Sequence, residues 1–362
     1  MKHLVHFITS LEQGGAQAVL YDIVSRINAP DISHTIVYIH DGPYKKQFEF
    51  LGIPLYQVRG LLNTYDPFIG IRLYRLLKKL QPDCLHTMLW SSNWLGRIVA
   101  KIIGIRVVAV LHNRCEHQNG IRTLLDRCAP ETGMIAVSNE VKVSFSKQFS
   151  QMSVIQNGVD IHYIQDQAQR QKKSKEELGL VSDTFVIGSV GRFHPVKRYP
   201  LLLESFALLY KERPYVRLML LGDGQELERL RLIAGDLGIS HAVRFIIGER
   251  AYGYYPLFDC FMQTSASEGI SIALLEAMSC GVPPLVTHSE AIHSVITNSY
   301  DGLLINSSNP ICIIDSIKLL IDNVTLRGTL SCNAQHTIAQ RFALDTMIAS
   351  YKEFLIPKIG NN

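Results

Sequence analysis

The chain has 362 residues, of which 47% are hydrophobic and 19% charged, a composition typical of folded globular proteins rather than disordered chains. At roughly 150 residues per domain, this length predicts two domains. The net charge of +4 is too small to indicate nucleic-acid binding, so we expect no nucleic acid among the partners.

The seven cysteines are odd in number and include no CxxC pair, so they predict neither a disulfide framework nor a zinc site. The first ten residues, MKHLVHFITS, lack the pattern of a signal peptide. No apolar run approaches the roughly 20 residues that span a bilayer. We therefore expect a cytoplasmic protein, soluble or peripheral to the membrane.

Short apolar runs alternate with helical patterns along the first half of the chain. The expected strands are His3–Ile8, Thr35–Ile39, Leu55–Val58, Cys84–Thr87, Val107–Leu111, Met134–Val137 and Val154–Gln156. The expected helices are Ala16–Ile27, Pro67–Leu80, Asn93–Ile103 and Glu140–Gln148. This alternation predicts a doubly wound parallel sheet of the α/β class, placed at residues 1–165.

The polar, poorly periodic segment IHYIQDQAQRQKKSKEELGLVSD follows, and we expect a linker at residues 166–183. A second Rossmann-like domain is then predicted at residues 184–340. Its expected strands are Phe185–Val190, Val216–Leu221, Val243–Ile246, Leu257–Gln263, Pro284–Val286 and Gly302–Ile305. Its expected helices are Pro200–Lys211, Gln225–Leu237, Ile270–Ser279 and Pro310–Asp322.

A last helix, Leu344–Leu355, lies within residues 341–362 and has no strand after it, so we expect it to pack back toward the first domain. In parallel sheets, ligands bind beyond the carboxyl ends of the strands. Two such domains therefore predict a binding cleft between them.

The first strand is followed by a glycine pair in SLEQGGAQAVL. Gly14 and Gly15 would let the backbone approach a sugar or a phosphate at the start of a helix. The spacing is not GxGxxG, and no acid about 20 residues later follows a second strand, so a dinucleotide site is not indicated. A plain tight turn explains this loop equally well.

Two cations, Arg192 and Lys197, follow the strand Phe185–Val190 in GSVGRFHPVKRYPLL. A guanidinium and an ammonium at one strand end can neutralise a diphosphate. The adjacent Gly191 favours this function over two solvated cations. After the next strand, the turn LGDGQ supplies Gly222 and Gly224, which would also bring the backbone close to a ligand.

Two acids, Glu268 and Glu276, stand eight positions apart in SASEGISIALLEAMSCGVP. They are either solvated and capping residues or two contacts to one ligand. A helix rise of ~1.5 Å per residue separates them by on the order of 10 Å, more than the ~5 to 5.5 Å of a retaining glycosidase pair. That span suits a sugar, a diphosphate and a ribose, with the helix N-terminus at Gly269, Ile270 and Ser271 against the phosphates.

The segment SEGISIALLEAMSCGVPPLVT resembles the EX7E motif of retaining glycosyltransferases of the family four, or group 1, class. The segments GGAQ, IQNGVD, VGRFHPVKR and GDGQE resemble other parts of that family in the same order, so the resemblance covers most of the chain. It implies the GT-B fold, in which two Rossmann-like domains face each other across a cleft.

The resemblance also implies roles for particular residues. Arg192 and Lys197 would bind the donor diphosphate and stabilise the leaving nucleotide. Glu276 would hold the ribose hydroxyls, and Glu268 would lie beside the donor sugar. The implied catalytic residues are His112, Glu268, Arg192 and Lys197. The implied donor-binding residues are Gly14, Gly15, Asn157, Gly191, Arg192, Lys197, Gly222, Gly224, Glu268, Gly269, Ile270, Ser271 and Glu276.

His112, in VLHNR, matches a histidine that contacts the donor sugar near the reacting carbon, and Asn157 stands at the domain crossover. Two departures from the family pattern occur. Arg198 stands where the family often has glycine, and Asn113 stands where an acid is frequent. The second departure leaves the hydrogen bonds to sugar and acceptor open.

These residues predict transfer of a sugar, with retention, from a nucleotide diphosphate donor, most simply UDP or GDP, to a glycan or lipid-linked glycan in polysaccharide or lipopolysaccharide biosynthesis. No two aspartates are two positions apart, so a DxD metal site is missing and Arg192 and Lys197 would offset the charge of the leaving group. No metal and no cofactor is expected. The alternatives are an inactive binding or scaffold protein with this fold and a nucleotide-sugar epimerase or oxidoreductase.

The segment DPFIGIRLYRLLKKLQP lies in the more basic half of the chain, where residues 1–165 hold 17 Lys and Arg against 12 Asp and Glu. A helix there could contact anionic lipid at the inner membrane face through Arg72, Arg75, Lys78 and Lys79. The alternative is a helix packed on its sheet through an apolar stripe of Ile71, Leu73, Leu76, Leu77 and Leu80.

Overall fold

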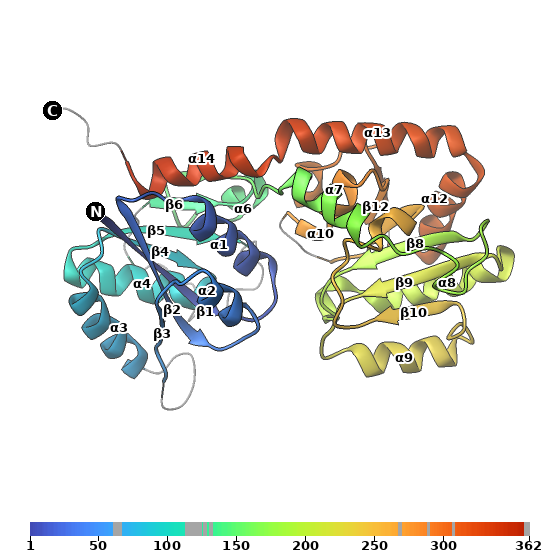
Figure 1. The fold of residues 1–362 in the computed structure, drawn as a ribbon. Coiled ribbons are helices and arrows are strands. Elements are labelled where there is room, and N and C mark those ends of the chain that lie inside the picture. The colour runs from blue at the N-terminus through green and yellow to red at the C-terminus, as the bar shows by residue number, and fades with distance from the viewer. Residues whose placement is uncertain are drawn as a thin grey trace. The chain divides into compact units, whose positions relative to one another are not determined.

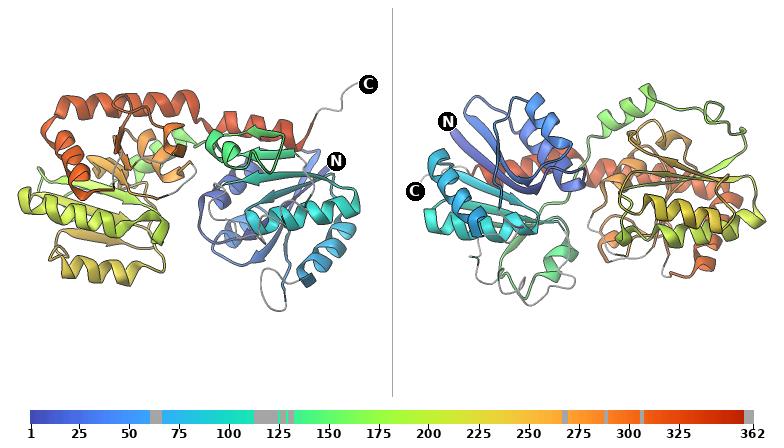
Figure 2. Two further views of the ribbon diagram at one scale, coloured as in Figure 1. Left: turned by 180° about the vertical axis from the view of Figure 1, so that it is seen from behind. Right: turned by 90° about the horizontal axis from the view of Figure 1, so that it is seen from below.

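The computed structural model describes residues 1–60, 67–112, 125, 129, 133–266, 270–287, 290–305 and 308–357. Internal contacts divide the chain into unit 1, Met1–Asn157 with Asp345–Asn362, and unit 2, Gly158–Leu344. Each unit contains a parallel sheet with helices on both faces (Figures 1 and 2). The parallel sheets predicted from the alternation are confirmed, and the expected boundaries at residues 165, 183 and 340 stay predictions.

Unit 1 is built on a seven-stranded sheet in the order β3-β2-β1-β4-β5-β6-β7, as far as the described residues show. Its strands are β1 Lys2–Ser10, β2 Ile32–His40, β3 Leu55–Gln57, β4 Cys84–Met88, β5 Arg106–Leu111, β6 Gly133–Ala136 and β7 Met152–Val154. Its helices are α1 Gly15–Arg26, α2 Tyr44–Phe50, α3 Pro67–Leu80, α4 Trp90–Ile103, α6 Asn139–Ser144 and α14 Leu344–Leu355. The central strands are buried on both faces, which explains why β5 reads as a continuous apolar run.

Unit 2 is built on a six-stranded sheet in the order β10-β9-β8-β11-β12-β13, again within the described residues. Its strands are β8 Phe185–Val190, β9 Val216–Leu221, β10 Val243–Ile246, β11 Cys260–Gln263, β12 Pro284–Thr287 and β13 Leu303–Ile305. Its helices are α7 Ile161–Arg170, α8 Tyr199–Glu212, α9 Leu227–Asp236, α10 Ile272–Ser279, α11 Glu290–His293, α12 Pro310–Asp322 and α13 Val324–Arg341, with 3-10 turns η1 Pro195–Lys197 and η2 Tyr255–Leu257. Side chains alternate between two cores, with Ile187 and Leu218 in one and Val186 and Met219 in the other.

Both sheets contain a point at which the strand order reverses. In unit 1, β1 lies between β2 and β4, and in unit 2, β8 lies between β9 and β11. Connections on the two sides of such a point leave in opposite directions, so a crevice opens at the carboxyl ends of the strands. The loops after β8, β9 and β11 therefore surround one position in unit 2.

Helix α3 packs on its sheet through Ile69, Leu73 and Leu77, which are at most 1% exposed. We predicted Ile71 in this apolar stripe, but its side chain is 47% exposed, as is that of Phe68 at 48%. At about 100° per residue, Ile71 is turned roughly 200° from Ile69. The packed-helix alternative therefore holds for the stripe but not for Ile71.

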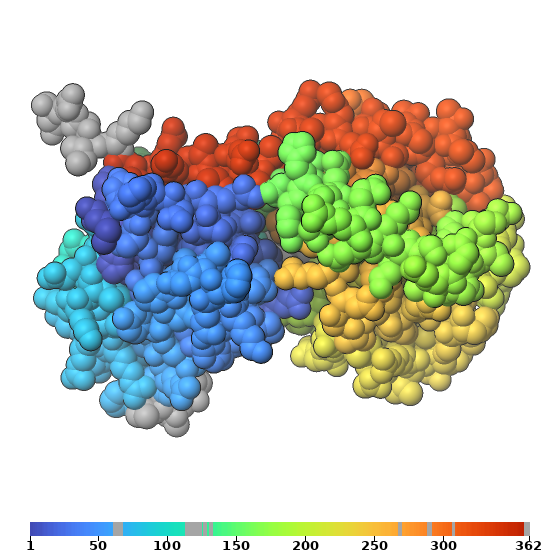
Figure 3. All heavy atoms as spheres, viewed as in Figure 1, coloured from blue at the N-terminus to red at the C-terminus, as the bar shows by residue number. Residues whose placement is uncertain are grey.

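Four of the described helices were not predicted, namely α2, α7, α11 and α13. Helix α7 occupies the start of the expected linker and lies at the surface of unit 2 (Figure 3), where it buries only Ile164 and Ala168. Its first turn is fixed by Asp160, whose carboxylate accepts a hydrogen bond from the Tyr163 amide at 2.9 Å. So few buried positions leave the helical period too weak to detect in the sequence.

The chain enters and leaves unit 2 at adjacent residues. The amide of Val159 donates to the carbonyl of Phe342 at 2.9 Å, and the amide of Leu344 donates back to Val159 at 3.0 Å. A Cβ on Gly158 would lie 2.8 Å from the carbonyl oxygen of Ala343, so the two segments approach as closely as glycine allows. Main-chain hydrogen bonds therefore join the two ends of unit 2 to each other.

Candidate functional site

The loops that follow β8 and β9 interlock through their backbones. Gly222 and Gly224 have φ values of +149° and +152°, and a Cβ on Gly222 would lie 2.0 Å from the carbonyl oxygen of Gly191. A Cβ on Gly224 would lie 2.4 Å from the carbonyl oxygen of Phe193. The amides of Gly191 and Phe193 donate to Leu221 and Asp223 at 2.9 and 2.8 Å. This packing accounts for both glycines, and their contact with a ligand stays a prediction.

Lys197 lies over the carboxyl end of β8. A Cβ built on Gly191 would be 3.5 Å from the Lys197 Nζ and 3.2 Å from the Tyr199 hydroxyl oxygen, so the ammonium group lies beside the Gly191 backbone. Arg192 leaves the same loop with an exposed side chain. The loop is shaped by η1, in which Pro195 occupies the first turn and the His194 side chain accepts from the Val196 amide at 3.3 Å.

Glu276 lies on α10, the helix that follows β11. Its carboxylate accepts a hydrogen bond from the Tyr255 hydroxyl at 2.7 Å. Burial raises the pKa of Glu276 to about 7, although the bond from Tyr255 and the charge of Arg250 act in the opposite direction. Tyr255 was not predicted, because its position is set by η2, whose short 3-10 turn has no apolar period of its own.

The start of α10 differs from the predicted one by two residues. The helix begins at Ile272, and Ser271 is its N-cap, with a side chain that accepts from the Leu274 amide at 3.4 Å. Ile270 is buried in the core of unit 2. Glu268 and Gly269 lie outside the described residues, so their predicted distance from Glu276 and their contacts stay predictions.

The remaining predicted residues lie in unit 1. Gly14 is the N-cap of α1 in an extended conformation, and Gly15 is the first residue of that helix. His112 follows β5, and burial lowers its pKa to about 4. The His112 Nε2 and the Asn157 Oδ1 are buried and have no hydrogen-bond partner among the described residues. Buried polar atoms without partners are uncommon in folded proteins, which is compatible with a ligand contact.

Family models match almost the whole chain. Residues 13–163 match the Glycosyltransferase Family 4 model, and residues 170–337 match the model of glycosyl transferases group 1. The chain belongs to the group 1, family 4 glycosyltransferases. It is accordingly a retaining glycosyltransferase, as its sequence predicts.

Two curated relatives of this glycosyltransferase illustrate the family. The Escherichia coli UDP-Gal:alpha-D-GlcNAc-diphosphoundecaprenol alpha-1,3-galactosyltransferase is 26% identical over 80% of this chain and 79% of the relative. The lipopolysaccharide core biosynthesis glycosyltransferase LpsD of Rhizobium meliloti (strain 1021) is 28% identical over 96% and 95% of the two chains.

Solved structures show the same fold. HepE of Anabaena, solved with UDP-glucose, has a TM-score of 0.86 at 22% identity, covering 98% of this chain and 99% of its own. WaaG, a glycosyltransferase involved in lipopolysaccharide biosynthesis, has a TM-score of 0.79 at 16% identity, covering 98% and 100%. The predicted GT-B fold of this glycosyltransferase is confirmed.

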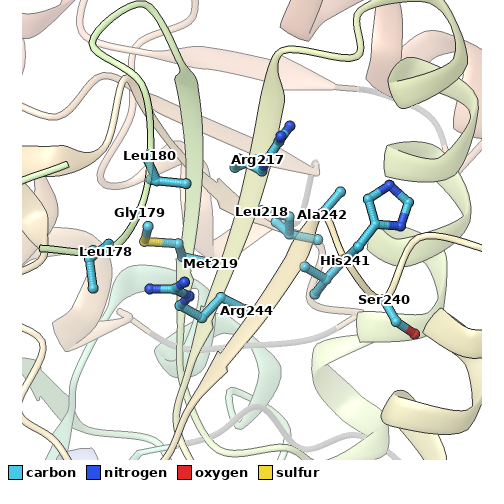
Figure 4. Close-up of a pocket in the computed structure, with 11 residues that line it drawn as sticks. Leu178, Gly179, Leu180, Arg217, Leu218, Met219, Ser240, His241, Ala242 and Arg244 are labelled. Atoms are coloured by element: carbon cyan, nitrogen blue, oxygen red, sulfur yellow. The ribbon is translucent and has the colours of Figure 1, made fainter. Parts of the chain in front are cut away.

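A separate hollow of about 330 Å³ lies at the other end of the unit 2 sheet (Figure 4). It is lined by the first residues of β9 and β10, including Arg217 and Arg244, whose side chains point in different directions in the figure. The Arg217 guanidinium donates to the carbonyls of Pro214 and Val216 at 2.8 and 2.7 Å. The protein itself thus holds this cation, away from the carboxyl ends at which a family 4 donor is expected.

Among the residues that the structure describes, no three His, Cys, Asp or Glu side chains are grouped so that they could hold a metal ion. Within the same residues, no helix is both long and apolar enough to span a membrane.

Proposed function

We propose that this glycosyltransferase takes its sugar from a UDP-sugar that binds unit 2 at the carboxyl ends of β8, β9 and β11. The observation that carries this proposal is the position of the Lys197 ammonium beside the Gly191 backbone, at the point where the strand order reverses. Arg192 extends from the same loop, so two cations lie at one strand end, where both can contact one diphosphate. The names of the relatives support uracil as the base, since the Escherichia coli enzyme is named for UDP-Gal and HepE was solved with UDP-glucose.

The state of Glu276 supports its proposed contact with the ribose. Its side chain is half-buried, and its pKa of about 7 means that no contact within the protein fully compensates a negative charge there. A ribose diol would supply two hydroxyl donors to the ionised carboxylate. We further propose that Glu268, His112 and Asn157 contact the donor sugar.

The proposed reaction transfers the sugar with retention, and Arg192 and Lys197 stabilise the charge that develops on the departing UDP. We propose that no metal ion is needed, because the chain lacks a DxD pair and carries these two cations instead. The expected result is that EDTA leaves the turnover of the purified protein unchanged. A loss of turnover that Mg²⁺ or Mn²⁺ restores would contradict this part of the proposal.

A thermal-shift screen against UDP, GDP, ADP and their sugars tests the donor. UDP and a UDP-sugar are expected to raise the melting temperature, because a ligand that binds only the folded state stabilises it. A shift with GDP or ADP but not with UDP would contradict the assigned base. No shift with any of them would contradict the proposed donor site.

We further propose that the acceptor is a lipid-linked glycan in cell-surface polysaccharide or lipopolysaccharide biosynthesis, reached from the cytoplasmic face of the membrane. The Escherichia coli relative is named for a diphosphoundecaprenol acceptor and LpsD for the lipopolysaccharide core. Helix α3 presents the exposed side chains Phe68 and Ile71 among its cations, which suits peripheral contact with anionic lipid.

Sedimentation with phosphatidylglycerol vesicles tests this contact. The protein is expected to bind at low salt and to be released as salt rises, and Lys78→Glu with Lys79→Glu should abolish binding. The control variant is Lys211→Glu, which reverses a charge on α8 of unit 2, and it should bind the vesicles normally. Absence of binding at every salt concentration would contradict the membrane contact and leave the donor proposal unaffected.

A further inference from the structure

Arg198 has an unusual backbone, and each of the three nitrogens of its guanidinium group donates a hydrogen bond. It lies between η1 and α8 with φ 49° and ψ 41°, the left-handed region that glycine adopts without strain. A residue with a side chain persists in that region when its surroundings compensate for the strain. The contacts of the Arg198 side chain supply that compensation.

The guanidinium group of Arg198 reaches two other loops. Its Nε donates to the carbonyl of Thr264 at 3.1 Å, and its Nη2 donates to the carbonyl of Ser265 at 3.3 Å. Its Nη1 donates to the Ser308 hydroxyl at 2.9 Å. Arg198 thus binds the segment after β11 and the segment after β13 from the loop after β8.

The same two loops are joined by bonds that run in the opposite direction. The Thr264 hydroxyl donates to the carbonyl of Lys197 at 2.8 Å, and the Ala266 amide donates to the carbonyl of Val196 at 2.8 Å. The acceptors of Arg198 are neutral oxygens, and the structure shows no carboxylate paired with it among the described residues.

We propose that Arg198 is a positioning residue of the donor site, which fixes Lys197 against the diphosphate by clamping the loop after β8 to the segment after β11. This inference rests on the proposed binding of a UDP-sugar at these strand ends. Arg198 itself need not touch the donor. Its effect passes through the backbone of Lys197, which is held from both sides.

Binding of UDP and of uridine to Arg198→Gly separates positioning from general stability. Glycine suits the left-handed backbone, so the variant is expected to fold, while the three side-chain bonds are lost. The dissociation constant of UDP should rise about tenfold, and that of uridine, which lacks the diphosphate, should stay the same. Ser299→Gly, which replaces another left-handed residue of unit 2 (φ 62°), is the matched control and should change neither.

A double-mutant cycle shows whether the effect passes through Lys197. In the Lys197→Ala background, Arg198→Gly should no longer weaken UDP binding, because the group that it positions is absent. Equal loss of UDP and uridine affinity, or a loss that persists in that background, would overturn the proposal.

Arg198→Lys provides a second variant should the glycine variant fail to fold. A lysine keeps the charge but cannot serve three acceptors with one fork, so it should weaken UDP binding by a similar factor. Full UDP affinity in this variant would assign the effect to charge and overturn positioning.

Hydrogen exchange tests, in the absence of nucleotide, whether Arg198 holds the loop after β8 to the segment after β11. The Ala266 amide should exchange faster in Arg198→Gly than in the unmodified protein, and an unchanged rate would overturn the clamp. If the unmodified protein binds no UDP, the donor proposal fails, and this exchange rate still decides whether the loops are clamped.

Discussion

The two sheets reverse their strand order in the same way, but they bury opposite kinds of titratable side chain. In unit 1, the Nδ1 atoms of His6 and His86 lie 2.9 Å apart, and the His6 Nε2 lies 2.9 Å from the His34 Nδ1. The His34 Nε2 lies 2.6 Å from the carbonyl oxygen of Ile27, which can only accept. The protons of this histidine row are therefore fixed, with His34 and His6 donating through Nε2 and His86 donating through Nδ1.

In unit 2, the buried titratable group near the strand ends is an acid. Glu276 accepts a hydrogen bond from the Tyr255 hydroxyl at 2.7 Å and a second one from Tyr252, and burial raises its pKa to about 7. Among the described residues, the histidine row keeps one buried ring nitrogen without a hydrogen-bond partner, the His86 Nε2. The carboxylate of Glu276 is held by the hydroxyl groups of its two tyrosines. The comparison teaches that one physical cause, the loss of water around a buried group, favours the neutral form of a base in unit 1 and of an acid in unit 2.

The largest expected effect comes from removing a cation of the donor site. Lys197→Ala or Arg192→Ala should lower the turnover of a UDP-sugar by roughly 10²- to 10³-fold, because charge on the leaving UDP is no longer stabilised. Release of UDP measures the turnover, and the melting temperature should stay close to that of the unmodified protein. Lys211→Ala, an exposed cation of the same unit, is the control. Near-normal turnover in both variants would place the diphosphate elsewhere.

Acid should affect the two units in opposite directions. Burial lowers the pKa of His86 to about 3, and the pKa values of His6 and His34 are lowered as well, first by burial. The stability that these neutral histidines contribute is complete above the unfolded pKa of about 6.5 and is lost as the pH falls below it. At pH 5, His86 alone should lower the free energy of unfolding by about 2 kcal/mol relative to neutral pH.

Tryptophan fluorescence can follow this loss, since Trp90 and Trp94, the two tryptophans of the chain, both lie on α4 of unit 1. The urea concentration at the midpoint of this signal should be lower at pH 5 than at pH 7. The control variant His162→Gln, which removes an exposed histidine, should leave this difference unchanged. Glu276 acts with the opposite sign, because its raised pKa makes its contribution fall as the pH rises from about 4.5 to 7. A fluorescence midpoint that does not depend on pH would refute the assignment of neutral histidines.

The smallest expected effect concerns the affinity for UDP-glucose. The ionised fraction of Glu276 falls about tenfold between pH 8 and pH 6, so binding through the ribose diol should weaken by up to about tenfold. Glu276→Gln should remove this pH dependence, and Tyr255→Phe should move it to higher pH, because the bond that favours the carboxylate is lost. Calorimetric titration at both pH values measures it. The same pH dependence in Glu276→Gln would show that another group is responsible.

The strand ends of this protein could be predicted because buried parallel strands form short continuous apolar runs and because glycines and charges stand directly after them. Arg192 and Lys197 were singled out in this way, and Glu276 by its spacing from Glu268, and their contacts with the donor stay predictions. Tyr255 could not be found, because its hydroxyl meets Glu276 only when η2 and α10 pack together. The same holds for Arg198, whose acceptors lie 66, 67 and 110 positions away along the chain.

Local structure was predicted less well where few residues are buried. Helix α13 was missed although it has 18 residues, because only Leu330, Ala334, Thr337 and Ile338 are buried on it and its sequence contains glycine and several β-branched residues. Strand β7 begins two residues before the predicted one, since its pairing with β6 sets its limits.

The joined ends of unit 2 have a consequence for the architecture of the gene product. Because Val159 is bonded to Phe342 and Leu344, unit 2 begins and ends at one place and is topologically an insert within unit 1. Because its two ends are neighbours, such an insert can be replaced as a whole without lengthening either connection to unit 1. The same closeness makes these ends a suitable place for circular permutation. Exchange of the whole of unit 2 between members of this family therefore requires only two cuts, a few residues apart in space.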